Sequence, residues 1–312
     1  MSPAATPRRR RSPARDRSEL WLFRIAVQTL GRLPRGVPAA LGRGLTRLYL
    51  RLSASRRRVL LGNLRQAFPE KSSREIARIA RDSMGSFGAA VMDFIEISRL
   101  DAEAIRSRVR VVGREHYDRA RALHRGVLLM SAHIGGWELG ALLGGILGEP
   151  IVPVIRPLDN PLLERELVRL RTRFGNRLIG KRDAAKDILK TLRADEAVAI
   201  LIDQNVIARE GVFVPFFGRL AATSPALALF QLKTGAPVVP VFVWPDGRGR
   251  YRVELEPAIL AEEFQQDGLD RAQAVLRATA RYTEVTEAAI RRDPAAWLWM
   301  HNRWRTRPEG AA

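Results

Sequence analysis

The stretch GVLLMSAHIGGWELGALLGGIL, residues 126–147, contains the change of secondary structure that decides the fold. Its first six residues are mostly aliphatic and predict a buried strand, whereas the part from Gly136 onward has the length and composition of a helix. His133 therefore lies where a strand ends and a helix begins. In open α/β sheets, ligands bind at the carboxyl ends of strands. Gly135 and Gly136 allow a sharp turn there and a close approach of a bulky ligand.

Further strands are predicted along the chain. The short aliphatic or β-branched runs VRVVG, IVPVI, AVAILID, PVVPVFV and YRVELE are separated by windows with helical periodicity. This alternation predicts an α/β fold, in which a central mixed sheet is flanked by helices. DGRGR at 246–250 is predicted to join the last two strands as a hairpin. Asn160 with Pro161 predicts a helix start, Gly235 predicts a helix end, and a long helix is expected over about 270–292.

The N-terminal third of the chain has a different pattern. We expect a disordered basic tail over residues 1–17, which are rich in proline and arginine, followed by a single domain over 18–312. Within that domain, 18–100 is predicted to be a helical region and 105–308 an α/β core. Residues 18–33 are too short and too interrupted by polar groups to predict a membrane-spanning helix. They form either an interfacial helix on a membrane or an amphipathic helix packed on the protein.

Composition narrows the class of function. The 312 residues carry a formal net charge of +20 and contain no cysteine. Without a thiol, the chain has no disulfide framework, zinc–thiolate site or cysteine nucleophile. The positive charge predicts an anionic partner, for which nucleic acid, acidic lipid headgroups, a phosphorylated glycolipid and an acidic carrier protein all qualify. Nucleic acid is disfavoured, because the sequence has no helix-turn-helix, RRM or zinc motif.

His133 and Glu138 are the ionisable residues of the apolar stretch. Burying either one without a partner costs several kcal/mol. Glu138 falls in the first turn of the predicted helix, where the helix dipole favours a negative charge. A glutamate that accepts from one imidazole nitrogen fixes the tautomer and leaves the other nitrogen as a base. The spacing alone leaves both a catalytic pair and a structural pair open.

Four segments together resemble a known family. The chain resembles the bacterial lipid A biosynthesis acyltransferases in four segments, which occur in the same order. They are SAHIGGWELG at 131–140, VIRPLDNPLLERELVRLRTRFG at 154–175, the run 201–242 and WMHNRWRTRP at 299–308. These lauroyl and myristoyl transferases belong to the wider glycerolipid acyltransferase superfamily with its H-x4-D/E signature. The resemblance covers most of residues 105–308. It implies a glycerolipid-acyltransferase-like fold and transfer of a fatty acyl group from an acyl thioester to a hydroxyl of a lipid A precursor.

The resemblance also implies roles for particular residues. His133 is expected to be the general base and Glu138 its orienting partner. Arg156 and Asp203 are implied as further active-site positions, and Gly136 and Trp137 join them as candidate substrate-binding residues because they lie beside His133. Asp203 is expected at the end of the strand that contains AILI, where it would either hold an arginine in place or meet the acceptor. Trp137 is expected either in the core or as a wall of an acyl pocket. Arg156 is expected to grip an anion, with a surface ion pair as the alternative.

The expected partners are an acyl donor, an anionic glycolipid acceptor and a membrane surface. The donor is acyl carrier protein or acyl-CoA, and neither a metal, a cofactor nor nucleic acid is expected. The predicted location is the cytoplasmic face of the bacterial inner membrane, with peripheral or N-terminal attachment. Three alternatives remain, namely a phospholipid or other glycolipid as acceptor, a hydrolase in which His133 activates water, and a non-enzymatic nucleic-acid-binding protein. His301, in the aromatic C-terminal segment, is predicted to be structural.

Overall fold

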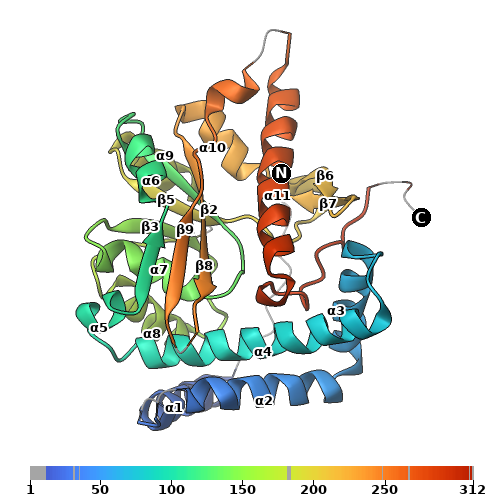
Figure 1. The fold of residues 1–312 in the computed structure, drawn as a ribbon. Coiled ribbons are helices and arrows are strands. Elements are labelled where there is room, and N and C mark those ends of the chain that lie inside the picture. The colour runs from blue at the N-terminus through green and yellow to red at the C-terminus, as the bar shows by residue number, and fades with distance from the viewer. Residues whose placement is uncertain are drawn as a thin grey trace.

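The structure is a computed structural model that describes residues 12–30, 32–34, 36–180, 184–247, 249–265, 268–308 and 310. Its centre is a seven-stranded sheet with helices on both faces (Figure 1). In sheet order the strands are β1 (Val109–Val112), β9 (Tyr251–Leu255), β8 (Val238–Pro245), β2 (Val127–Ser131), β5 (Ala197–Leu201), β3 (Ile151–Ile155) and β4 (Ile179–Gly180). Neighbouring strands are parallel, except that β8 and β9 are antiparallel. The predicted α/β fold with a mixed sheet is confirmed.

The β8–β9 turn is the hairpin that the sequence predicts at 246–250. Gly247 and Gly249 have positive φ angles of 67° and 70°, which glycine adopts without strain. The sequence prediction did not include β4, nor the separate antiparallel pair β6 (Val212–Phe216) and β7 (Arg219–Thr223). β4 has only two residues, too few to form a pattern. The turn between β6 and β7 has positive φ angles at both Phe217 and Gly218. Gly218 is an ordinary turn residue, but phenylalanine is not one of the residues that mark the first position of such a turn.

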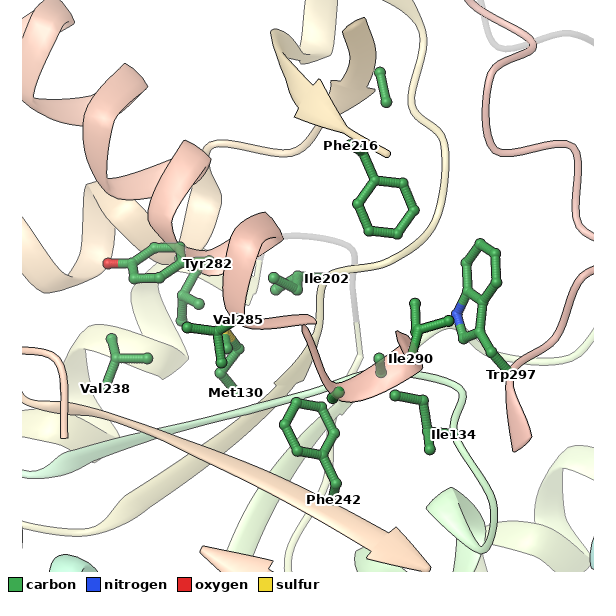
Figure 2. Packing of buried hydrophobic residues seen from close by; sticks show 14 of the residues in the cluster. Met130, Ile134, Ile202, Phe216, Val238, Phe242, Tyr282, Val285, Ile290 and Trp297 are labelled. Carbon is green, nitrogen blue, oxygen red and sulfur yellow. The ribbon is translucent and has the colours of Figure 1, made fainter. Parts of the chain in front are cut away.

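Alternate residues of β2 face the two sides of the sheet. Leu128 and Met130 join the cluster that contains α9 (Ala184–Arg193), α10 (Ala226–Thr234) and α11 (Arg271–Arg292). Figure 2 shows Met130 and Val238 beside Tyr282 of α11. On the other side, Val127 and Leu129 pack with α6 (Arg114–Arg121). Because both faces are covered, the strand is a continuous apolar run.

The same side of the sheet as α6 carries α7 (Trp137–Ile146), which contacts β3 and β8. α5 (Ala102–Arg106) and α8 (Pro161–Thr172) pack against α7. The predicted start of α8 is confirmed, because the Asn160 side chain accepts hydrogen bonds from the N–H groups of Leu162 and Leu163. Gly235 ends α10 in the left-handed conformation, as predicted. The short 3₁₀ helices are η1 (Ala208–Glu210), η2 (Ala261–Phe264) and η3 (Pro294–Ala296).

Helices make up most of the described part of residues 18–100, so the predicted helical region is confirmed. They are α1 (Pro13–Leu30), α2 (Val37–Leu52), α3 (Ala54–Ala67) and α4 (Ser73–Ile97). α4 crosses below the sheet, and α1 and α2 lie along its outer side (Figure 1). α2 and α4 approach closely where two glycines meet, since a Cβ on Gly42 would lie 2.3 Å from the Gly88 carbonyl oxygen.

The end of the predicted tail 1–17 is helical. Residues 1–11 lie outside the described residues, but 13–17 belong to α1. The reason is local, because the Ser12 hydroxyl accepts from the Arg15 N–H and Arg15 pairs with Glu19 four residues later. Among the described residues, the helices fall short of the length and apolarity needed to cross a bilayer.

Candidate active site

His133 sits in a tight turn between β2 and α7. Gly135 has φ +51°, and a Cβ there would lie 2.3 Å from the Val243 carbonyl oxygen. That same carbonyl accepts a hydrogen bond from the Gly136 N–H. The turn therefore packs tightly against β8, which explains why position 135 needs glycine. At Gly136 a Cβ would lie 3.1 Å from a side-chain carbon of Val243, so the space there is also narrow. This close packing fixes the backbone that carries His133.

Asp203 holds the His133 ring. The ring nitrogen Nδ1 is 2.8 Å from Asp203 Oδ1, and the His133 backbone N–H donates to Asp203 Oδ2 at 2.9 Å. Trp297 Nε1 donates to the same Oδ2 at 2.8 Å. Asp203 is only 4% exposed, so its carboxylate depends on these three donors in place of water. The predicted placement of Asp203 at a strand end is confirmed.

The charges of this pair follow from burial and mutual attraction. Burial raises the pKa of Asp203, but the charge of His133 and the hydrogen bonds to its carboxylate outweigh that effect and hold the pKa well below its usual range. Burial lowers the pKa of His133, whereas Asp203 and the charge of Glu138 raise it above its ordinary value. Because Asp203 is ionised and can only accept, the proton of neutral His133 lies on Nδ1 and Nε2 carries the lone pair.

The lone-pair nitrogen is the atom that can act as a base. His133 Nε2 is 3.3 Å from the amide nitrogen of Gln204, which is an exposed side chain. No other hydrogen-bond partner of Nε2 occurs within the described residues. A hydroxyl group that replaces Gln204 would therefore meet an imidazole whose tautomer is already fixed.

Glu138 does not orient His133, which corrects the sequence prediction. Its carboxylate forms a bidentate ion pair with Arg171 of α8. Arg171 Nη2 lies 2.9 Å from both Glu138 oxygens, and Arg171 Nε lies 3.2 Å from Glu138 Oε2. Glu138 belongs to the first turn of α7, which packs on α8, whereas Asp203 follows the strand next to β2. The remaining influence of Glu138 on His133 is its charge.

An apolar cavity of about 280 Å³ adjoins this site. Trp137 forms one wall, with its ring stacked on Phe87 at 6.0 Å and 7° and lying 5.6 Å from the His133 ring. Its other walls come from α1, α4, α7 and α8, including Phe23, Phe94, Leu139 and Leu167. Glu138 and Arg171 are the charged residues of the lining. Gly136 also lines the cavity, so two of the candidate substrate-binding residues face the same space.

Arg156 follows β3 at the same edge of the sheet as His133 and Asp203, because β2, β5 and β3 are parallel neighbours. It is exposed, and in the part of the chain that the structure describes it forms no ion pair. The predicted alternative, a surface ion pair of Arg156 with Asp159 or Glu164, is not seen among the described residues. The Glu164 carboxylate instead accepts from the Leu158 N–H at 2.7 Å.

Three contributors were missed by sequence reasoning. Trp297 lies in an aromatic run that predicts core, and nothing in the run signals that one indole N–H reaches Asp203. Arg171 is one of several arginines on α8 and carries no distinguishing pattern. Gln204 follows Asp203 directly, so the strand-end rule would have included it. No cluster of three or more His, Cys, Asp or Glu suited to a metal occurs among the described residues.

Comparison with known proteins gives one consistent family. The model of the bacterial lipid A biosynthesis acyltransferase family matches residues 8–306. The lipid A biosynthesis lauroyltransferase of Escherichia coli (strain K12) is 32% identical over 297 residues, 93% of each chain. The palmitoleoyltransferase of the same organism is 28% identical over 293 residues, 93% of this chain and 90% of its own. The myristoyltransferase is 26% identical over 293 residues, 93% and 88% of the two chains.

Proposed function

The chain belongs to the bacterial lipid A biosynthesis acyltransferase family, and on that premise we propose that it transfers a fatty acyl group from acyl carrier protein to a hydroxyl of a lipid A precursor. The enzyme class, an O-acyltransferase, follows from the family. The donor and the mechanism are the proposed parts. The observation that carries the mechanism is the hydrogen bond of His133 Nδ1 to buried Asp203, beside an apolar cavity.

In the proposed reaction, His133 Nε2 removes the proton of the acceptor hydroxyl as its oxygen attacks the thioester carbonyl carbon. The carbonyl oxygen becomes an oxyanion, the carbon–sulfur bond then breaks, and the thiolate receives the proton from the imidazolium. Asp203 stabilises the imidazolium that exists between the two transfers and keeps the ring in one orientation. No covalent acyl-enzyme is required.

The cavity beside Trp137 is the proposed site of the acyl chain. Its lining is apolar apart from the Glu138–Arg171 ion pair, and an alkyl chain gains free energy when such a surface replaces water. Trp137 contacts both the cavity and the His133 ring, so a chain in the cavity would carry its thioester toward the base. Phe23 of α1 is one of the walls, so the length of chain accepted would depend on this helix.

The acceptor and the membrane account for the positive charge in this proposal. Arg156 supplies an unpaired guanidinium for an anionic headgroup at the sheet edge that carries His133. Residues 20–69 contain ten arginines and no Asp or Glu. On α2 the exposed side chains include an apolar stripe at helical spacing, made of Val37, Leu41, Leu45, Leu48, Tyr49 and Leu52.

We define the α1–α2 surface as this stripe together with exposed Trp21, Leu22 and Ile25 of α1. Apolar side chains among arginines suit the interface of a bilayer that contains anionic lipids. The surface supports attachment of the protein to the cytoplasmic face of the inner membrane, where its acceptor would lie. From the sequence, membrane association was expected within the helical region 18–100 and above all at residues 18–33, and α2 extends the proposed contact beyond them.

The direct test is an assay of the purified protein with acyl thioesters on acyl carrier protein and on CoA, offered with lipid A precursors and with phospholipids. The proposal predicts an ester product that requires a lipid A precursor and is formed faster from the carrier protein. Release of free fatty acid at the same rate without any acceptor would indicate a hydrolase instead. An acylated phospholipid as the main product would support the alternative acceptor.

A further inference from the structure

His301 is linked to the site by a chain of hydrogen bonds. The C-terminal segment after η3 runs beside the loop that follows β5, and the Asn205 backbone N–H donates to His301 Nε2 at 2.9 Å. The Asn205 side chain makes two further bonds to Thr306, one to its N–H at 3.1 Å and one to its hydroxyl at 3.0 Å. Asn205 is thereby held on both its backbone and its side chain.

The residues held in this way are the ones that touch the base. Asp203, Gln204 and Asn205 are consecutive, and the first two reach the two ring nitrogens of His133. A shift of the Asn205 backbone would therefore move both contacts of the base together. His301 is itself fixed, because its carbonyl oxygen accepts from the side chain of buried Asn63 at 2.8 Å.

The hydrogen bond to Asn205 works with only one protonation state of His301. A backbone N–H is a donor, so Nε2 must present a lone pair, and the proton of the neutral ring then lies on Nδ1. In the protonated ring both nitrogens are donors, and Nε2–H would face the Asn205 N–H without an acceptor between them. Protonation of His301 would therefore release the loop.

We propose that neutral His301 is a positioning residue, whose Nε2 fixes the loop Asp203–Asn205 and so holds Asp203 and Gln204 against His133. This inference rests on the proposed function for its effect on the rate, but the hydrogen bond can be tested without turnover. If fixing the loop has no effect on the reaction, His301 has only the structural role that the sequence predicts.

The surroundings of His301 favour the neutral ring. Burial lowers the pKa of His301, and the charges of Arg303, His133 and Arg56 lower it further, while Asp203 alone raises it. These groups come from the C-terminal segment, the β2–α7 turn, α3 and the loop after β5. Arg303 has no exposed surface and is bound to the Ala222 carbonyl and the Thr223 hydroxyl, so its charge is fixed in place.

The test compares two substitutions with a matched control. His301→Leu removes the acceptor, and His301→Gln offers an amide oxygen near the place of Nε2 that does not titrate. His116→Gln, on α6, changes a histidine whose side chain has no hydrogen-bond partner within the described residues. We expect kcat/KM to fall roughly 10- to 100-fold in His301→Leu, because small misplacements of reacting groups cost rates of that order. We expect His301→Gln to recover most of the loss and His116→Gln to resemble the unchanged protein.

The pH profile separates positioning from mere packing. In the unchanged protein, log(kcat/KM) should fall with slope one as His133 is protonated and with slope two at lower pH, where His301 is also protonated. In His301→Gln the slope should stay at one. A slope of two in His301→Gln, or unchanged kcat/KM in a well-folded His301→Leu, would overturn the proposal.

Hydrogen exchange of the Asn205 amide, followed by NMR, tests the bond in the absence of substrate. We expect this amide to be protected above the pKa of His301, to lose protection below it, and to be unprotected in His301→Leu. Protection that is independent of His301 would overturn the inference even if acyl transfer is observed. Protection that follows His301 in a protein that does not transfer acyl groups would instead count against the proposed function.

Discussion

His133 and Asp203 occupy matched positions on neighbouring parallel strands. The last residues that pair between β2 and β5 are Ser131 and Leu201. His133 lies two residues beyond Ser131, and Asp203 lies two residues beyond Leu201. The Ile202 N–H still donates to the Ser131 carbonyl, so the ladder continues almost to the site. The sheet itself thus sets the separation of the imidazole and the carboxylate, which keeps the pair rigid with respect to the core.

The first prediction concerns the pH dependence of acyl transfer. His133 acts only when neutral, and its raised pKa means that kcat/KM should fall as the pH drops through a value above 6.5, the ordinary histidine pKa. Asp203→Asn removes the charge that raises this pKa and leaves burial, which lowers it. The acid limb should then move to lower pH while the plateau falls. An acid limb that does not move in Asp203→Asn would mean that another group is titrating.

The second prediction concerns Glu138 and Arg171. Glu138→Ala leaves Arg171, whose side chain is 11% exposed, without its partner in an apolar lining, at a cost of about 1–3 kcal/mol in the free energy of unfolding. Arg171→Ala should also destabilise the protein and weaken donor binding. Because the two act as one ion pair, the double variant should be little worse than the worse single variant. Denaturant unfolding and kcat/KM would measure the coupling, and additive losses would show that the pair is not a unit. Glu115→Ala, an exposed site on α6, is the control.

The third prediction concerns acyl length. Phe23→Ala should enlarge the cavity and shift the preference toward longer acyl chains by about 10-fold, since each added methylene in an apolar pocket changes the free energy by about 1–3 kcal/mol. Phe23→Trp should shift it toward shorter chains. Trp21→Ala changes the exposed side of the same helix and serves as the control. Competition between two acyl carrier protein thioesters gives the ratio directly. The same ratio in all four proteins would exclude Phe23 as a wall of the acyl site.

The fourth prediction concerns the α1–α2 surface. Leu45 and Leu48 of α2 are 57% and 51% exposed, and replacing both with Asp should weaken binding to vesicles that contain phosphatidylglycerol without loss of folding. Binding of the unchanged protein should also weaken with added salt, because the arginines act through screened charge. Leu276→Asp on α11 places one new charge on an exposed leucine elsewhere. Equal vesicle binding by all three proteins would remove the α1–α2 surface from the account.

Much of the fold could be predicted, because its strands are aliphatic runs between clear helix signals. β2 and β5 are recognisable for this reason, and Asn160 and Gly235 mark helix ends through their own chemistry. The hairpin β6–β7 was not predicted, because Phe217 takes the left-handed conformation that Asn, Asp or Gly usually fill, and Gly218 alone does not identify a two-residue turn.

Sequence reasoning named His133, Glu138 and Asp203 but not which of them pair, and it missed Trp297, Arg171 and Gln204. The spacing of His133 and Glu138 suggested that these two side chains meet. The contact of His133 with Asp203 instead joins the ends of two strands, so it depends on the order of strands in the sheet, which a single sequence does not contain. Asp203 and Trp297 are 70 and 94 residues from their hydrogen-bonding partners, His133 and Asp203 respectively. Arg171 likewise reaches Glu138 only because α7 and α8 pack together.

The most direct test of the account is a double-variant cycle on His133 and Asp203, with acyl transfer and thermal unfolding measured on the same preparations. His133→Ala should lower turnover by roughly 10²- to 10⁴-fold, the range for a positioned base. Asp203→Asn should also be severely impaired, and the double variant should be little worse than His133→Ala, because residues that act as a unit are not additive. Each protein should remain folded at the assay temperature. Acyl transfer at the unchanged rate by well-folded His133→Ala would contradict the account.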